Sequence, residues 1–185
     1  MTVVRLAIPE VVLLTPPRFA DARGHFSETF NAERFRREVA DVSFLQDNQS
    51  LSRARGTLRG LHLQLPPFAQ GKLVRVVRGA VFDVAVDVRA GSPHYGRHVG
   101  ATLSAENGAQ LWIPPGFLHG FCTIEPDTEV LYKVTAAYDR GSERGIVWND
   151  PTLAIPWPVA PEDAVLSDKD AALPRWSEGL AWFPA

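Results

Sequence analysis

The chain has 185 residues, 45% of them hydrophobic and 22% charged, which fits a globular protein with a sizeable core. A formal net charge of −2 excludes the strong positive field that draws proteins to nucleic acid or to acidic membranes. Cys122 is the only cysteine, so an intramolecular disulfide and a cysteine-based zinc site are excluded, and a reducing, cytoplasmic setting is expected.

The N-terminal stretch MTVVRLAIPEVVLLTPPRF holds short apolar runs broken by Arg5, Pro9 and Glu10, unlike a signal peptide. No run approaches the roughly eighteen apolar residues of a membrane span. There is no internal repeat, low-complexity tract or linker. The sequence therefore predicts one domain over residues 1–185.

One helix is predicted early in the chain. In NAERFRREVA, residues 31–40, Asn31 is a good N-cap, and Phe35 and Val39 lie four residues apart on one helical face.

Most other segments alternate between apolar and polar residues, as strands do. In AVFDVAVDVRAG four apolar residues from Phe82 to Val88 share one face, and Asp83 and Asp87 lie on the other. Further strands are predicted in GKLVRVVRGA, in HVGATLSAENGAQLWIPPGFLHGFCTI, where ENG and PPG form turns, and in EVLYKVTAAY. Many short strands between glycine and proline turns indicate a sandwich or barrel, which the proline-rich C-terminal third would wrap.

Two histidines, His62 and His119, are embedded in apolar strands, where a lone histidine is more often structural than catalytic. A general base needs an orienting partner, and removing a proton beside a ketone needs a cation for the enolate oxygen. The sequence offers His62 as base, Lys72 as cation, Tyr132 as proton donor and Asp170 as orienting carboxylate. Each also has a structural explanation: a core aromatic for Tyr132, a strand end for Lys72 and a solvated loop for Asp170.

The stretch RGLHLQ raises a difficulty, because strict alternation points Arg59 and His62 to opposite faces. Either the strand is irregular there or Arg59 reaches round an edge. A metal site of two histidines and a carboxylate is disfavoured, because there is no H-x-H pair and Lys72 and Arg59 would repel a cation. Arginines and lysines are plentiful for an anionic ligand, although no glycine-rich phosphate loop is present.

Across most of its length, from about residue 7 to about residue 175, the chain resembles the dTDP-4-dehydrorhamnose 3,5-epimerase family. The matching stretches, in order, are D-x-RG-x-F-x-E-x-F (21–30), QDNQS (46–50), LRGLHLQ (58–64), AQGKLVRVVRGAVFDVAVDVR (69–89), LSAEN (103–107), QLWIPPGFLHGF (110–121), LYKVT (131–135), ERGIVWNDP (143–151) and LSDKD (166–170).

The resemblance implies a mainly β fold, the cupin-type double-stranded β-helix or jelly roll, with a few short peripheral helices. It implies a homodimer with an exchanged N-terminal strand, and an enzyme without metal or organic cofactor. Its substrate would be dTDP-4-keto-6-deoxy-D-glucose, epimerised at C3 and C5 to dTDP-4-keto-L-rhamnose. Neither nucleic acid nor membrane would be a partner.

The resemblance also assigns roles to residues. His62 would be the proton acceptor with Asp170 as its partner, Tyr132 the proton donor, and Lys72 the group that stabilises the enolate. The diphosphate would be bound by Arg59 and Arg23, and the thymine would stack on Tyr138 beside Phe26. The rest of the nucleotide-sugar site would be lined by Glu28, Gln46, Asn48, His119, Glu143 and Lys169.

Two positions depart from the family pattern. Leu63 follows the base histidine where the family often has an aromatic residue, and Ala137 precedes the stacking tyrosine where it often has aspartate. They leave open a single-centre epimerase, acting at C3 or C5 of a dTDP-4-keto-deoxyhexose for a secondary-metabolite sugar. A non-catalytic or metal-dependent sugar-binding cupin is a further alternative.

Overall fold

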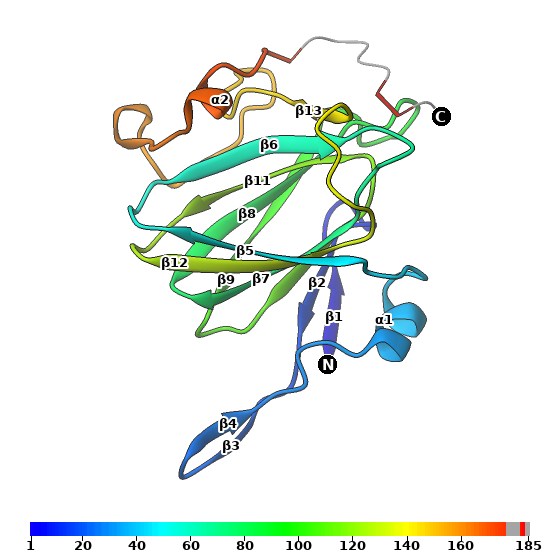
Figure 1. Cartoon of the computed structure of the whole chain (residues 1–185), viewed down its shortest axis with the longest axis vertical. Helices are drawn as coiled ribbons and strands as arrows, with labels where there is room; N and C mark the ends of the chain where they lie inside the picture. Colours follow the sequence, from blue (N-terminus) through cyan, green and yellow to red (C-terminus); the bar gives the residue numbers. More distant parts are fainter. Residues whose placement is uncertain (177–181, 184–185) are drawn as a thin grey trace.

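The computed structural model describes residues 1–176 and 182–183, and this part of the chain forms two antiparallel sheets (Figure 1). The larger sheet has the strand order β1-β2-β10-β7-β12-β5: β1 Thr2–Arg5, β2 Val12–Thr15, β10 Gln110–Ile113, β7 Lys72–Arg78, β12 Thr128–Val134 and β5 Gln46–Ser52. The smaller has the order β13-β6-β11-β8-β9: β13 Glu143–Gly145, β6 Leu58–Gln64, β11 Phe117–Thr123, β8 Ala80–Asp87 and β9 His98–Ser104. The remaining elements are the hairpin β3 Phe19–Asp21 and β4 Gly24–Phe26, and the helices α1 Ala32–Glu38, η1 Pro161–Asp163 and α2 Asp168–Ala171.

The chain changes sheet repeatedly between β7 and β12. It runs from the larger sheet (β7) to the smaller (β8, β9), back to the larger (β10), to the smaller (β11) and to the larger again (β12). Glycines with positive φ make two of these turns, Gly79 at 73° and Gly116 at 89°. This winding around a shared core is a jelly roll, so the predicted mainly β, cupin-type fold is confirmed.

The main core lies between the two sheets. Its side chains include Val74 and Leu111 from the larger sheet and Val81 and Phe121 from the smaller. The alternation of β8 is as predicted, but both of its faces are buried. One points into this core, and the other is covered by residues of the C-terminal third such as Ile146.

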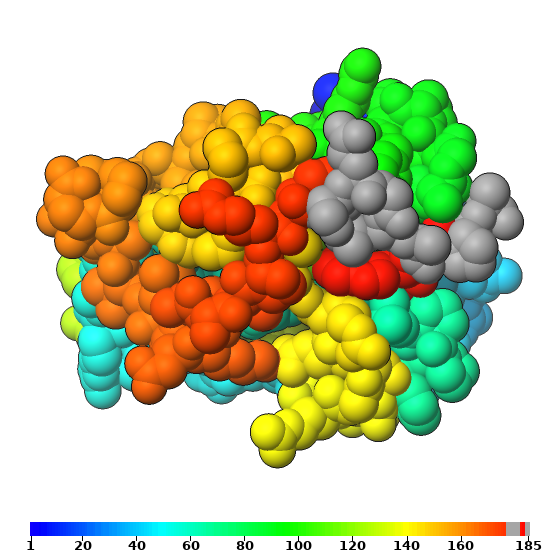
Figure 2. Space-filling view, turned by 90° about the horizontal axis from the view of Figure 1, so that it is seen from above, coloured from blue at the N-terminus to red at the C-terminus, as the bar shows by residue number. Residues whose placement is uncertain are grey.

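The C-terminal third wraps the smaller sheet, as predicted. In Figure 2 the yellow, orange and red residues spread over one end of the molecule. This layer covers the valine face of β8, which carries Val84 and Val86. Asp83 and Asp87 alternate with these valines and so lie on the face that points between the two sheets, where both are fully buried.

The predicted helix is present but shorter than the segment 31–40, since it spans Ala32–Glu38. The Asn31 side chain caps it by accepting a hydrogen bond from the Arg34 amide at 3.0 Å. Phe35 is buried edge-on against Trp112, with ring centroids 5.3 Å apart, and Val39 is the C-cap. The helix thus covers the outer face of the larger sheet.

Two N-terminal elements bear on assembly. Strand β1 pairs with β2 of the same chain. The β3–β4 hairpin projects away from the sandwich (Figure 1), with Phe19 63% and Phe26 70% exposed. No helix in the described residues is long and apolar enough to cross a membrane.

Candidate active site

A pocket of about 340 Å³ opens where both sheets meet the C-terminal layer. All four predicted catalytic residues and five of the ten predicted binding residues line it. The full lining is Ser50, Arg59, His62, Lys72, His119, Phe121, Tyr132, Tyr138, Glu143, Ser167, Lys169 and Asp170.

Strand β6 is irregular where it enters the pocket, and this brings Arg59 and His62 to the same side. His62 pairs with His119 and Arg59 with Phe121, so three steps along β6 match two along β11. The extra residue forms a bulge. At Gly60, φ is 110°, and a Cβ atom there would lie 2.6 Å from the His119 carbonyl oxygen. Strict alternation of side chains therefore does not hold between Arg59 and His62, because the glycine between them forms a bulge.

The His62 imidazole is held by a carboxylate from the C-terminal layer. Its Nε2 lies 2.7 Å from Oδ1 of Asp170, and the Gly60 amide donates to Oδ2 of the same carboxylate. Burial raises the pKa of Asp170, but His62, Gly60 and Ser167 together lower it below its ordinary value. Asp170 therefore stays ionised at neutral pH and can hold the His62 ring in a fixed orientation.

Asp83, which the sequence reasoning did not single out as functional, forms a second histidine–aspartate pair. Nε2 of His119 lies 2.6 Å from its Oδ1. Burial lowers the pKa of His119, and the negative charge of Asp83 opposes that shift. A signal was available, because an aspartate inside an apolar strand that is covered on both faces must find a partner.

The Lys72 side chain enters the pocket from the start of β7. Burial lowers its pKa from 10.5 to about 8, while the charges of Asp83 and Glu143 act in the opposite direction. The ammonium group therefore stays mostly protonated at neutral pH. A desolvated cation of this kind interacts strongly with a developing oxyanion.

Tyr132 faces the pocket from β12, on the opposite sheet from His62. Burial raises the pKa of its phenol, and Arg59 partly offsets this. The phenol therefore keeps its proton across the neutral range and can donate it.

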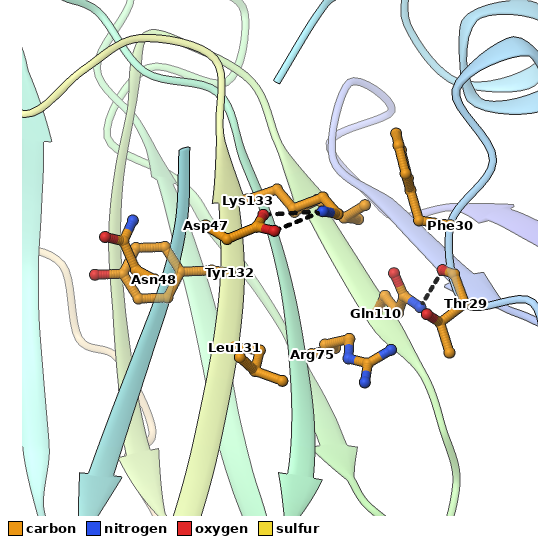
Figure 3. Close-up of a pocket in the computed structure, with 10 residues that line it drawn as sticks. Thr29, Phe30, Asp47, Asn48, Arg75, Gln110, Leu131, Tyr132 and Lys133 are labelled. Carbon is orange, nitrogen blue, oxygen red and sulfur yellow. Dashed lines mark hydrogen bonds and ion pairs between the residues drawn. The ribbon is translucent and has the colours of Figure 1, made fainter. Parts of the chain in front are cut away.

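The outward side of the same sheet carries a different hollow. Figure 3 shows Tyr132 and Asn48 on one side of the strands and Lys133 on the other. There Lys133 bonds Asp47 at 2.9 Å, and Gln110 donates to the Thr29 carbonyl at 2.8 Å. This hollow holds neither histidine pair, and its lysine is already neutralised. The acid–base chemistry therefore belongs to the inner pocket.

The rim of the inner pocket carries a three-residue network. The Tyr138 hydroxyl donates to Oε2 of Glu143 at 3.0 Å, and Nζ of Lys169 lies 2.6 Å from the same oxygen. Burial raises the pKa of Glu143, but the bonds from Lys169 and Tyr138 lower it overall. The Tyr138 side chain is 56% exposed, so its ring is accessible to a ligand.

Five predicted binding residues do not line this pocket. Arg23 is on the projecting hairpin, ion-paired with Asp21 of the same hairpin at 2.6 Å. Phe26 ends that hairpin, and Glu28 follows it. The other two, Gln46 and Asn48, are on the edge strand β5, where the Gln46 amide donates to the Asn48 oxygen at 2.6 Å.

The described residues contain no group of three or more histidine, cysteine, aspartate or glutamate side chains that could hold a metal ion. The pocket instead combines two histidine–aspartate pairs with two lysines, an arginine and two tyrosines. Fold and site together define a cupin-type protein whose pocket is equipped for proton transfer beside an anionic ligand.

The chain belongs to the dTDP-4-dehydrorhamnose 3,5-epimerase family, whose sequence model matches residues 5–178. A dTDP-4-dehydrorhamnose 3,5-epimerase from Sinorhizobium fredii is 58% identical over 173 residues, covering 94% of this chain and 88% of that protein. The crystal structure of the Bacillus anthracis enzyme with TDP and PPi bound superposes with a TM-score of 0.91 and 46% identity, over 95% of this chain and 99% of that one. The crystal structure of a Legionella pneumophila epimerase in complex with dTDP-4-keto-L-rhamnose superposes with a TM-score of 0.88 and 44% identity. The match covers 95% of this chain and 98% of that one.

Proposed function

We propose that this protein epimerises dTDP-4-keto-6-deoxy-D-glucose at C3 and C5 to give dTDP-4-keto-L-rhamnose. The observation that carries the proposal is the meeting of the His62–Asp170 pair, Lys72 and Tyr132 in one pocket. Family membership and the sugar nucleotide bound by the Legionella relative support the substrate.

The proposed mechanism uses side chains alone and no cofactor. His62 removes the proton from the carbon beside the C4 ketone, and the electron pair of that C–H bond moves to the C4 oxygen. Lys72 stabilises the resulting enolate. Tyr132 then returns a proton to the same carbon from the other face, and solvent restores both residues to their starting protonation states. The positions of His62 and Tyr132 on opposite sheets support this inversion, because the sugar would lie between them.

The same pocket is proposed to hold the nucleotide. Arg59 would bind the diphosphate, and the exposed ring of Tyr138 would stack on the thymine. Glu143, Lys169 and His119 would complete the wall. A cytoplasmic location is proposed with the function, in keeping with the single cysteine.

The hairpin residues are proposed to act in a homodimer. Arg23 and Phe26 lie on a hairpin that projects from its own sandwich (Figure 1). In a symmetric dimer each hairpin would reach the pocket of the other copy, delivering Arg23, Phe26 and Glu28 there, and Gln46 and Asn48 would lie at the shared edge.

Mixing inactive variants tests the dimer. Arg23→Ala and His62→Ala are each expected to be inactive, but subunits mixed and reassociated should recover about a quarter of wild-type activity, since half the dimers would hold one intact site. Mixing His62→Ala with Tyr132→Phe is the matched control, because both changes affect the pocket of their own chain and no intact site can form. Recovery in the control, or none in the first mixture, would contradict the exchanged hairpin.

Tyr132→Phe tests the two-face mechanism. The variant keeps the base and the oxyanion stabiliser, so it should still wash deuterium from heavy water into the sugar. It should lose at least about a hundredfold in formation of inverted product. Proton NMR of the same sample measures both. Full epimerase activity would remove Tyr132 from the mechanism.

The function itself is tested by proton NMR in heavy water with dTDP-4-keto-6-deoxy-D-glucose and no added metal. Loss of both the C3 and C5 signals, with conversion to the L-lyxo sugar, is expected. Loss at one carbon only would establish the single-centre epimerase. No exchange at either carbon would overturn the proposal for this substrate.

A further inference from the structure

We propose that Gln64 is a positioning residue for the nucleotide, because its buried amide fixes the loop that presents Tyr138. This inference rests on the proposed function and deepens it. Gln64 ends strand β6, two residues after His62, and its side chain does not line the pocket.

All three hydrogen bonds of the Gln64 amide go to backbone groups. Its Nε2 donates to the carbonyls of Phe68 at 2.7 Å and Ala137 at 3.0 Å, and its Oε1 accepts from the Asp139 amide at 2.8 Å. The residue is only 4% exposed. Two of these bonds are made to Ala137 and Asp139, the residues on either side of Tyr138. The amide therefore fixes the backbone from which the Tyr138 ring projects.

Further hydrogen bonds hold the rest of the loop, as far as Ser142. The Asp139 carboxylate accepts from the Ser142 amide at 2.7 Å, and the Ser142 carbonyl accepts from the Leu65 amide at 2.9 Å. Both the start of the loop, at Ala137, and its end, at Ser142, are therefore hydrogen-bonded to the C-terminal end of β6 or to the residue that follows it. Within the described part of the chain, the Tyr138 side chain makes one hydrogen bond, from its hydroxyl to Glu143.

This arrangement ties the nucleotide end of the site to the strand of the proposed base. A shift of the loop would move the Tyr138 ring while leaving His62 and Asp170 in place. The departure at position 137 does not weaken the clamp, because Gln64 bonds the backbone carbonyl of Ala137 and not its side chain. The alanine can therefore be accommodated without loss of the stacking position.

Replacing Gln64 with methionine keeps the length and approximate shape but leaves two carbonyls and one amide unpaired. The loop should relax, and the ring should lose its preferred position. We expect KM for the sugar nucleotide and Kd for free dTDP to rise about tenfold each, with kcat within about twofold of wild type. A general loss of structure would instead lower kcat as well.

The matched control is Thr128→Val. Thr128 is also fully buried, and its hydroxyl clamps the turn at the other end of β12 by donating to the Glu125 carbonyl at 2.8 Å. Its replacement should lower thermal stability in the manner of Gln64→Met while leaving KM and the Kd for dTDP unchanged. A rise in Kd in both variants would reduce the Gln64 effect to stability.

A double-mutant cycle with Tyr138→Ala gives the decisive readout, by calorimetric titration with dTDP. If Gln64 acts by placing the ring, Gln64→Met should weaken dTDP binding little further once the ring is gone, within about twofold. Full additivity, or an unchanged Kd in the single variant, would overturn the inference. Should Gln64→Met fail to fold, Gln64→Glu carries the same cycle, since it keeps the acceptor for the Asp139 amide and loses both donors.

The two proposals fail in different ways. If wild type does not exchange protons of the 4-keto sugar, the proposed function fails. If wild type turns over and Gln64→Met keeps its KM, only the positioning role fails.

Discussion

Two histidine–aspartate pairs lie side by side in this pocket, and they differ in where the carboxylate comes from. His62 and His119 are direct cross-strand neighbours on β6 and β11. Asp170 reaches His62 from the C-terminal layer, and Asp83 reaches His119 from within the sandwich. The His62 side chain is 23% exposed and that of His119 only 9%.

The difference in exposure separates two roles for the same chemical pair. A proton acceptor must reach both substrate and solvent, which His62 can do. Burial disfavours the charged form of His119, so that ring suits a fixed polar contact beside Lys72. In the proposed mechanism the first pair would therefore exchange protons and the second would shape the electrostatics of the pocket.

Replacing each histidine with alanine should produce the largest differences in kcat and KM between the two pairs. His62→Ala should lower kcat by about a hundred- to ten-thousandfold and abolish deuterium exchange into the sugar. His119→Ala should mainly raise KM, with kcat within about tenfold, because its pair does not take the proton. Steady-state kinetics and NMR exchange measure these effects, with circular dichroism as the folding control. Equal losses of kcat would erase the distinction.

A smaller effect than that of the histidine variants is expected in the alkaline limb of the pH profile of kcat/KM. Lys72, with a pKa of about 8, should lose its proton as pH rises through that value, so kcat/KM should fall there. The negative charge of Asp83 raises the pKa of Lys72, so Asp83→Asn should move the limb to lower pH.

Asp87→Asn is the control for that shift, because Asp87 is equally buried on the same strand but is ion-paired with Arg89 away from the pocket. The alkaline limb of the kcat/KM profile of Asp87→Asn should stay at the same pH as in wild type. A limb unmoved by Asp83→Asn would mean that the second pair does not control the charge of Lys72.

The smallest expected effect is on stability. The pKa of Asp170 is lower in the folded chain than its ordinary 3.8, so its ionised form stabilises the fold above that value. This contribution is lost as pH falls through the folded pKa. Wild type should therefore melt about 2–4 °C above Asp170→Asn at neutral pH. The gap should close in strongly acidic buffer, and a gap that persists there would place the stabilisation elsewhere than in the carboxylate charge.

Sequence patterns predicted the strands well because alternation and turn glycines are local properties. They could not place Arg59 beside His62, since that depends on a bulge at Gly60 that fits against β11. They also missed the pairing of Asp83 with His119. That aspartate was recognised as lying opposite the valine face of β8, but which face meets the pocket depends on the packing of the two sheets.

Chemistry and family resemblance point to the four proposed catalytic residues, but only the three-dimensional fold shows that they meet in one pocket. His62 and Asp170 are far apart in sequence, and no periodicity connects them. The role proposed for Arg23 and Phe26 depends on a second copy of the chain, since the hairpin that carries them projects from its own sandwich.

The C-terminal layer has a consequence for biosynthesis. The Gly60 amide bonds a carboxylate that follows 110 residues later, so His62 acquires its partner only long after its own strand has left the ribosome. All strands of both sheets, from β1 to β13, precede Asp170 in the chain. A nascent chain can therefore build its sandwich first, and the proposed proton-transfer activity would appear only when the segment that carries Asp170 closes over it.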